Sequence, residues 1–223
     1  MIAILVPLLG RAHQIDPLLT NIAAATSTPH RVVLICSPQD DTRQAARASD
    51  ADTIVVPWSP GRADYARKLA AGYLATDEPW LFQGASDLVF HPNWDLAALK
   101  AAKAKGRGVV GTNDLGNPLV KRGRHSTHSL ISRDYIETYG GTADGTGLIF
   151  SEAYDHQYTD NEFIETARRR KQFIFARNSI VEHLHPHWGK AETDPTYEKA
   201  LRRTKQDMQL FMARRRGILQ RIQ

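Results

Sequence analysis

The first half of the chain alternates short, continuous apolar runs with segments that carry apolar residues at helical spacing. The apolar runs, typical of buried strands, are 2–7, 31–37, 52–58, 79–85 and 108–113. The segments with helical spacing are 15–26, 42–49, 64–76 and 92–106. Continuous apolar strands joined by helices are typical of a mostly parallel sheet covered by helices on both faces. The pattern therefore predicts an α/β fold.

The second half alternates less regularly. Residues 128–132 predict a strand followed by a short helix, and 173–176 and 179–185 predict two short strands. A helix over 159–171 is expected to begin with a Thr-x-x-Glu capping box, formed by Thr159 and Glu162. From residue 194 a long amphipathic helix is expected. The residues on its apolar side are Tyr197, Leu201, Met208, Phe211 and Met212.

Composition fits one soluble globular domain over residues 1–223, with 42% hydrophobic and 24% charged residues. The single cysteine, Cys36, excludes a disulfide within the chain and fits a cytoplasmic protein. The N-terminal MIAILVP lacks a basic segment and predicts a core strand rather than a signal peptide. Since no apolar run approaches the ~20 residues that a membrane-spanning helix needs, we expect no membrane span.

The net charge of +5 is concentrated at the C-terminus. Residues 199–223 contain eight Lys or Arg and one Asp, a net +7, which leaves −2 for residues 1–198. Such a basic segment can approach nucleic acid, an anionic membrane face or an acidic partner. Alternatively, the arginines are the solvated face of a helix that packs on the domain.

In α/β sheets of this kind, ligands bind at the carboxyl ends of the strands. The predicted ends are at 7–11, 37–38, 58–60 and 84–87, which directs attention to Arg11 and Asp87. Asp87 lies between two apolar segments, and the next helix begins too far away, near Pro92, for Asp87 to cap it. We therefore expect Asp87 to hold a ligand, with a cation as the first candidate.

Three histidines alternate in the segment 181–190, at positions 183, 185 and 187. In an extended segment they share one face, which suggests a metal site. The alternative is one structural, one ligating and one solvated histidine. A carboxylate and one imidazole leave several positions open on Mn²⁺ or Mg²⁺, so substrate phosphates can complete the shell.

A helix that begins near residue 159 carries carboxylates in its first turn. The helix dipole keeps such a carboxylate ionised, so Asp160 is a candidate base at neutral pH. A plain capping turn explains Glu162 fully and Asp160 less well. The segment 111–129 is rich in turn formers and polar groups and is a candidate for contacts with an acceptor.

Together these segments resemble family-two-like glycosyltransferases of the GT-A fold, of the short kind encoded by actinobacterial phages. The residues that carry the resemblance are ILVPLLGR, DYARKLAAGY, EPWLFQGASD, GTNDLGNP, YTDNEFIETARRR and VEHLHPHWGK. It implies a nucleotide-sugar-binding half (1–113), an acceptor and catalytic half (114–190) and a C-terminal helical extension (191–223).

The resemblance also implies roles for individual residues. The expected nucleotide contacts are Pro7, Arg11, Lys68, Ser86 and Asp87. Asp87 and His185 are expected to bind the metal, and Asp160 to act as the base. The expected acceptor contacts are Asn113, Asp114, His128 and Trp188. Ser86 and Thr159 stand where this family has acids, and residues 36–41 (CSPQDD) lack its usual Asp-Asp-Gly-Ser.

The implied reaction is transfer of a sugar from a nucleoside diphosphate sugar, by default a UDP-sugar, to a hydroxyl, with inversion if Asp160 is the base. The acceptor is a hydroxymethylated base of phage DNA, a virion protein or a saccharide, and the basic C-terminal helix favours DNA. A phage enzyme of this kind would act in the cytoplasm of its host. The alternatives are a nucleotidyltransferase, which would need a Gly-rich phosphate loop after the first strand, and a non-catalytic nucleic-acid-binding protein.

Overall fold

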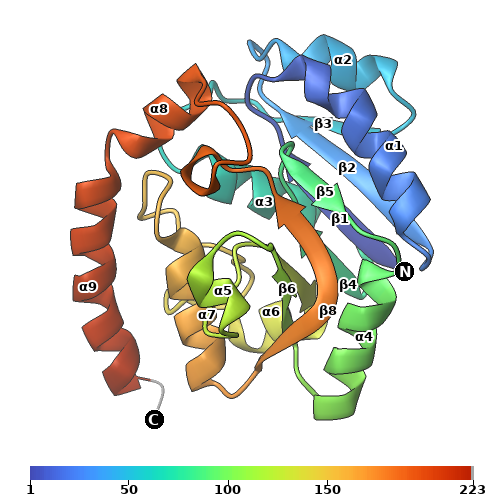
Figure 1. The fold of residues 1–223 in the computed structure, drawn as a ribbon. Coiled ribbons are helices and arrows are strands. Elements are labelled where there is room, and N and C mark those ends of the chain that lie inside the picture. The colour runs from blue at the N-terminus through green and yellow to red at the C-terminus, as the bar shows by residue number, and fades with distance from the viewer. Residues whose placement is uncertain (222–223) are drawn as a thin grey trace.

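The computed structural model describes residues 1–221 and contains an eight-stranded sheet with helices on both faces (Figure 1). The strands are β1 (Ile2–Pro7), β2 (His30–Cys36), β3 (Asp52–Val55), β4 (Trp80–Gln83), β5 (Leu88–Phe90), β6 (Val109–Asn113), β7 (Ser129–Ser132) and β8 (Phe173–His183). Their order in the sheet is β3-β2-β1-β4-β7-β6-β8-β5. The pairings show that β5 and β7 run against the other strands. The predicted mostly parallel α/β sheet is confirmed.

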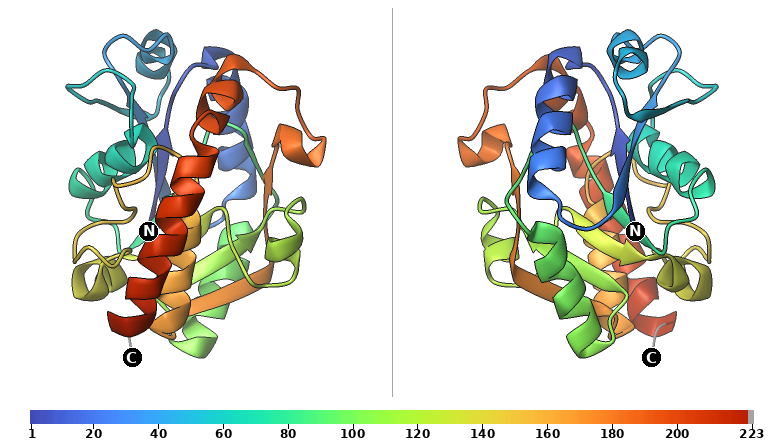
Figure 2. Two further views of the ribbon diagram at one scale, coloured as in Figure 1. Left: turned by 90° about the vertical axis from the view of Figure 1, so that its left-hand side faces the viewer. Right: turned by 90° about the vertical axis from the view of Figure 1, so that its right-hand side faces the viewer.

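Helices cover both faces of this sheet. They are α1 (Ile15–Ala25), α2 (Thr42–Ala48), α3 (Asp64–Leu74), α4 (Trp94–Lys105), α5 (Pro118–Lys121), α6 (Arg133–Tyr139), α7 (Thr159–Arg169), α8 (Pro195–Leu201) and α9 (Thr204–Arg221), with short 3₁₀ helices η1 (Ala12–Gln14) and η2 (Pro186–Trp188). Helices α1 and α4 lie on one face, α3, α6 and α7 lie on the other, and α9 runs beside α7 (Figure 2). Within the described residues, no helix is long and apolar enough to cross a membrane.

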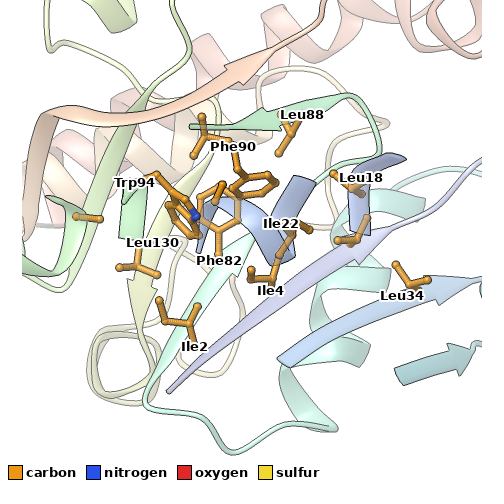
Figure 3. Close-up of a cluster of buried hydrophobic side chains, with 14 of the residues drawn as sticks. Ile2, Ile4, Leu18, Ile22, Leu34, Phe82, Leu88, Phe90, Trp94 and Leu130 are labelled. Carbon is orange, nitrogen blue, oxygen red and sulfur yellow. The ribbon is translucent and has the colours of Figure 1, made fainter. Parts of the chain in front are cut away.

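The core forms two layers, one on each face of the sheet. Strand β1 lies inside the sheet, so both of its faces are buried, and this explains its unbroken apolar sequence. Ile2 and Ile4 pack toward α1 and α4, whereas Ala3 and Leu5 pack toward α3. In the first layer the rings of Phe82, Phe90 and Trp94 meet with centroids 4.6–5.4 Å apart (Figure 3).

Two differences from the predicted strands concern the far edge of the sheet. The three-residue strand β5 was not predicted, because a short apolar pair after a turn gives no periodic signal. The prediction of two short strands over 173–185 is wrong, since residues 173–183 form one continuous strand. Strand β8 follows β6 with a shift of register between Gly111 and Asn113, which lets it curve along the sheet (Figure 1).

The C-terminal segment also differs from its prediction. It forms two helices instead of one, and three residues of the predicted apolar side are exposed: Leu201 by 53%, Met208 by 38% and Met212 by 50%. The face of α9 that packs on the domain includes Phe211 and Ile218, and Phe211 stacks on Tyr158. The break after α8 changes the helical phase, so a stripe drawn through one long helix was wrong.

The predicted capping box at the start of α7 is also wrong. Tyr158 is the N-cap residue, in a left-handed conformation and with no side-chain capping bond. Glu162 is fully buried and instead accepts hydrogen bonds from Tyr154 and Arg214. The sequence could not reveal this because Arg214 is 52 positions away.

Candidate functional site

One edge of the sheet gathers most of the polar residues singled out in the sequence. Strands β1, β2, β4, β6 and β8 all end there, and the antiparallel strand β7 begins there. The strand ends and loops at this edge carry Pro7, Arg11, Asp40, Ser86, Asp87, Asn113, Asp114, His125, His128, His183 and His185. The topology therefore explains how residues far apart in the sequence come to share one site.

The unpredicted strand β5 is what brings the late histidines to Asp87. Because β5 pairs antiparallel with β8, Leu88 lies opposite His183. The next residues continue this pairing, and the backbone amide of Leu184 donates to the carbonyl oxygen of Asp87 at 2.9 Å. Asp87 and the segment 183–185 are therefore neighbours in the fold.

The carboxylate of Asp87 is 7% exposed and is surrounded by donors. Its Oδ2 accepts from Arg11 Nη1 at 2.9 Å and from the hydroxyl of Tyr197 at 2.5 Å, and it lies 3.5 Å from His183 Nε2. Burial alone would raise the pKa of this carboxyl, but hydrogen bonds from His183 and Tyr197 and the charge of Arg11 hold it well below its usual range. Asp87 is therefore ionised at neutral pH, and the groups around it stabilise its negative charge.

Arg11 holds an unusual backbone position directly after β1. Its φ of 62° is left-handed, and its side chain is only 9% exposed. Besides Asp87, the guanidinium contacts Asp194 through two hydrogen bonds and lies 4.1 Å from the ring centroid of Tyr197. Burial lowers the pKa of Arg11, but the hydrogen bond to Asp194 and the charge of Asp87 outweigh it and raise the pKa.

Lys68 lies beneath the loop after β1 and does not project from it. Its side chain is 1% exposed, and its ammonium donates to the carbonyl of Leu8 at 2.5 Å and pairs with Asp64 at 2.7 Å. Asp40, which follows β2, accepts from the backbone amide of Gly10 at 3.2 Å and lies 3.9 Å from Lys68. This buried group fixes the loop that presents Arg11.

Imidazole rings form a contiguous cluster next to Asp87. The ring of His183 lies 5.0 Å from that of His128 and 5.0 Å from that of His185, which in turn lies 4.8 Å from Tyr197. The expected shared face therefore holds for two of the three alternating histidines. His187 is instead exposed in η2, where it contacts Trp188.

His128 is buried and presents a bare acceptor. Its Nδ1 lies 2.9 Å from the carbonyl oxygen of Gln83, which can only accept, so Nδ1 carries the proton in the neutral ring. Its Nε2 has no hydrogen-bond partner among the described residues. Burial lowers the pKa of His128 to about 4, so the ring is neutral at pH 7.

The carboxylate of Asp87 and the imidazoles beside it fit a divalent cation whose remaining coordination positions are filled by a bound substrate. Within the described residues, no three His, Cys, Asp or Glu side chains form a complete metal site. A carboxylate suits Mn²⁺ and Mg²⁺, and a neighbouring imidazole shifts the preference toward Mn²⁺. Asp87 with His183 or His185 would hold such an ion and leave positions for oxygen atoms of a substrate.

Asp160 forms a second acidic centre at the same edge. Its Oδ2 lies 3.0 Å from Nε2 of His125, and its side chain is 24% exposed. Burial raises the pKa of Asp160, but the charge and hydrogen bond of His125 outweigh it, so the pKa is lowered. Burial, and then the charges of Asp87 and Asp160, raise the pKa of Tyr65, whose hydroxyl donates to the carbonyl of Gly84 at 2.9 Å.

Helix α9 fixes the loop that leads to Asp160. The carboxylate of Asp207 is 4% exposed and accepts three backbone hydrogen bonds, from residues 155, 156 and 157, at 2.9–3.0 Å. The basic C-terminal segment is thus also a structural part of the domain.

Three of the four expected acceptor residues, Asn113, Asp114 and Trp188, lie in loops beside this edge, whereas His128 belongs to the imidazole cluster. Asn113 donates to the carbonyl of Arg177, and Asp114 is 2% exposed and accepts from the backbone amides of residues 116 and 117. Trp188 packs on Gly116, where an added Cβ would lie 2.8 Å from the indole. Asn113 and Asp114 are therefore committed to shaping the loop, and Trp188 covers it.

Sequence reasoning missed several residues of the site. His125 had no signal of its own within a polar segment, and Asp194 was read as the start of a helix. Tyr197 was assigned to an apolar packing stripe, whereas its hydroxyl bonds Asp87. A carboxylate before a proline and a tyrosine three residues later is also a common helix start, so only the fold could reveal this contact.

Comparisons with known proteins identify the fold. No family model matches the sequence, and no curated protein matches it. Glucosyl-3-phosphoglycerate synthase from Mycobacterium tuberculosis, solved with Mn²⁺, UDP and phosphoglyceric acid, aligns with a TM-score of 0.64 and 16% identity over 96% of this chain and 78% of that chain. A mannosyltransferase from Pyrobaculum calidifontis, solved with GDP-Man and Mn²⁺, aligns with a TM-score of 0.63 and 17% identity over 82% of this chain and 57% of that chain. The fold is therefore GT-A-like.

Proposed function

We propose that this protein is a metal-dependent glycosyltransferase that moves a sugar from a nucleoside diphosphate sugar to a hydroxyl group. The observation that carries the proposal is the position of Asp87. This buried carboxylate follows β4 at the carboxyl edge of a GT-A-like sheet, with imidazoles of the segment 183–185 beside it. The two structural neighbours named above were solved with Mn²⁺ and a nucleotide or nucleotide sugar, which supports the same donor class.

The donor site would use the groups around Arg11. Asp87 and one imidazole, His183 or His185, would hold a divalent cation, and when bound there the ion would supply a Lewis acid that neutralises the leaving diphosphate. The guanidinium of Arg11 would bind phosphate oxygens through its two-pronged donor geometry. UDP is the default nucleotide, since the mycobacterial neighbour binds it, and GDP is the alternative given by the mannosyltransferase.

The acceptor would be activated on the Asp160 side. Asp160 would take the proton of the acceptor hydroxyl on its carboxylate, and His125 would hold that carboxylate in position through the 3.0 Å contact. Direct attack of the activated hydroxyl on the anomeric carbon, with departure of the diphosphate, would invert its configuration. Retention in the product, read by NMR, would contradict this role for Asp160.

The acceptor we propose to test first is a hydroxymethylated base in DNA; the same chemistry on a virion protein or a saccharide is the alternative. Exposed basic residues in the turn between α8 and α9 and on α9 itself support an anionic acceptor: Arg202, Arg203, Lys205, Arg215 and Arg216. A base in a duplex would have to leave the stack to reach Asp160. Binding of DNA without any binding of nucleotide sugar would instead favour a non-catalytic nucleic-acid-binding protein, with a steep dependence on salt.

The decisive experiment is a panel of UDP- and GDP-sugars, each with and without Mn²⁺, scored by thermal stabilisation and by donor hydrolysis. We expect at least one donor to stabilise the protein only when Mn²⁺ is present. Asp87→Ala should abolish that stabilisation. Asp52→Ala is the matched control, since Asp52 pairs with Arg31 on the surface with its side chain 54% exposed. Intact metal-dependent binding in Asp87→Ala would refute the assigned site.

A further inference from the structure

Arg11 and Asp87, the groups proposed to bind the donor, are bonded to residues from the C-terminal part of the same chain. We propose that the residues from Asp194 to Tyr197, which we call the 194–197 latch, occupy the diphosphate and cation positions, so that a nucleotide binds only when the latch leaves Arg11 and Asp87. This inference rests on the proposed function, because it takes Arg11 and Asp87 as the groups that bind the nucleotide and its metal ion.

Asp194 takes the place of a phosphate group on Arg11. Its Oδ2 accepts from Nε of Arg11 at 2.6 Å, and its Oδ1 accepts from Nη2 at 3.1 Å. Carboxylates and phosphates present the same pair of oxygen atoms to a guanidinium, so they compete for it with similar geometry. A bound diphosphate and Asp194 cannot both use this edge of Arg11.

Tyr197 and Arg11 together take the place of a cation on Asp87. The hydroxyl of Tyr197 and Nη1 of Arg11 both contact Oδ2 of Asp87. The ring of Tyr197 also covers the guanidinium and lies against His185, the other predicted metal ligand. A metal ion that used this oxygen would have to displace both donors.

The acid of the latch is more exposed than the arginine that it binds. The side chain of Asp194 is 34% exposed, whereas that of Arg11 is 9% exposed, so Asp194 is the partner that can leave. Residues 191–193 are exposed, and Gly189, with φ of 69°, allows the chain to turn before them. Since Arg11 would exchange the carboxylate of Asp194 for a phosphate group, release of Asp194 would cost little free energy once a diphosphate is present.

The substitution Asp194→Asn tests the contact with Arg11 without disturbing the start of α8. Asparagine caps helices as well as aspartate does and can still accept from the amide of Tyr197, which now bonds Oδ1 of Asp194 at 2.9 Å. It removes the charge that binds Arg11. We expect Asp194→Asn to bind UDP in the presence of Mn²⁺ about 10-fold more tightly than the wild type, because a charge-assisted contact that competes with the ligand is lost.

Glu192→Gln is the matched control, since it makes the same chemical change at an exposed position two residues earlier. Binding of Mn²⁺ and UDP to the full-length chain is measured by titration calorimetry, with thermal unfolding as the check on folding. Tightening in Asp194→Asn alone supports the latch. Equal tightening in both variants, no change, or weaker binding in a folded Asp194→Asn protein overturns it.

The outcomes also distinguish this inference from the proposed function. If the wild type binds UDP with Mn²⁺ and Asp194→Asn binds it equally well or more weakly, the latch is wrong and the glycosyltransferase proposal stands. If neither protein binds any nucleotide of the donor panel, both proposals fail. Hydrogen exchange adds a reading independent of affinity: Mn²⁺ with UDP should speed exchange at the first amides of α8, and slower exchange there would contradict release.

Discussion

The two C-terminal helices are attached to the domain by the same set of residue types. In what we call the α9 anchor, the buried carboxylate of Glu162 accepts from Arg214 through both oxygen atoms, at 2.6 and 2.7 Å, and from the hydroxyl of Tyr154. Arg214 also contacts a second, more exposed acid, Asp144, at 2.7 Å. The 194–197 latch repeats this arrangement with Asp87, Arg11, Tyr197 and Asp194.

The difference lies in how the buried carboxylate is used. Both oxygen atoms of Glu162 are bonded, whereas the hydrogen bonds and the ion pairs that the described residues make to the carboxylate of Asp87 all fall on Oδ2. Asp87 also faces a cluster of imidazoles at the carboxyl edge of the sheet. Glu162 is covered by its own helix and by α9, and its side chain is 0% exposed.

This comparison teaches that a buried Arg–carboxylate–Tyr group does not by itself mark a functional site. In the α9 anchor the helix supplies the arginine, and the group stabilises the fold. Where the 194–197 latch binds, the domain supplies both Arg11 and Asp87, and only the partners that we propose to be displaced come from the latch, Tyr197 from α8 and Asp194 from the position just before that helix. A ligand site keeps both of its charged groups on the domain when the helix is displaced, as Arg11 and Asp87 would be kept. A structural anchor loses one of them, as Arg214 would be lost with α9.

The largest expected effect is on stability, at the α9 anchor. Glu162→Ala leaves Arg214 and the hydroxyl of Tyr154 without their buried partner and should lower the free energy of unfolding by about 3–5 kcal/mol. Glu165→Ala, on the same helix, removes a carboxylate that lies 3.5 Å from Arg169 and 3.6 Å from Arg215 of α9, both of them exposed, and should cost less than about 1 kcal/mol. Urea denaturation measures both. A cost below 1 kcal/mol for Glu162→Ala would mean that α9 is held in another way.

The next effect is the response to acid of the imidazole cluster beside Asp87, which has no counterpart at the α9 anchor. The pKa of His128 is lowered to about 4 by burial, below its usual value of about 6.5. Above pH 6.5 the ring is neutral in both the folded and the unfolded state. As the pH falls, the ring is protonated in the unfolded state before it is protonated in the folded state. Stability from this group should thus fall from pH 6.5 toward pH 4, by about 1.4 kcal/mol per pH unit at most.

The check is urea denaturation of the wild type and of His128→Gln at pH 7.5, 6 and 5. The variant should lose less stability than the wild type over this range, because it removes the titrating ring. Equal losses would show that His128 does not contribute to the acid response.

Most of the fold could be predicted from the sequence, because most strands and helices are specified by residues that are neighbours in the chain. Strands β1 to β4 and helices α1, α3 and α4 follow hydrophobic runs whose spacing is set by neighbouring residues. The position of Asp87 could be predicted too, because it depends only on where β4 ends. Asp160 could likewise be placed in the first turn of α7 from its local sequence.

What could not be predicted depends on contacts between distant segments. The pairing of β5 with β8 brings His183 to Asp87, and no local signal announces a three-residue strand. The bond between Tyr197 and Asp87 joins residues 110 positions apart, and that between Arg11 and Asp194 joins residues 183 apart. In the latch that we propose, these contacts determine whether the site is open, so its state depends on the fold and not on a motif.

The third expected effect is on ligand binding at Asp87. Asp87→Asn should weaken Mn²⁺-dependent binding of UDP by at least about 100-fold, more than the loss of an outer-shell partner costs. It should destabilise the protein less than Glu162→Ala does, because Arg11 keeps its two hydrogen bonds to Asp194. Calorimetric titration and urea denaturation give the two readings. A variant with the reverse pattern would mean that Asp87 is an anchor like Glu162.

The smallest effect tests the two tyrosines against each other. Tyr197→Phe removes the hydroxyl that bonds Asp87 but keeps the ring on Arg11, and it should tighten binding of Mn²⁺ with UDP about 3-fold, as one competing hydrogen bond is lost. Tyr154→Phe removes the equivalent bond to Glu162 and should lower stability by about 1 kcal/mol while leaving nucleotide affinity unchanged. Titration of both variants against the wild type gives the comparison. If Tyr197→Phe weakens binding, then the hydroxyl of Tyr197 helps to hold the ligand and does not compete with it. Tyr197 would then support Asp87 in the same way as Tyr154 supports Glu162.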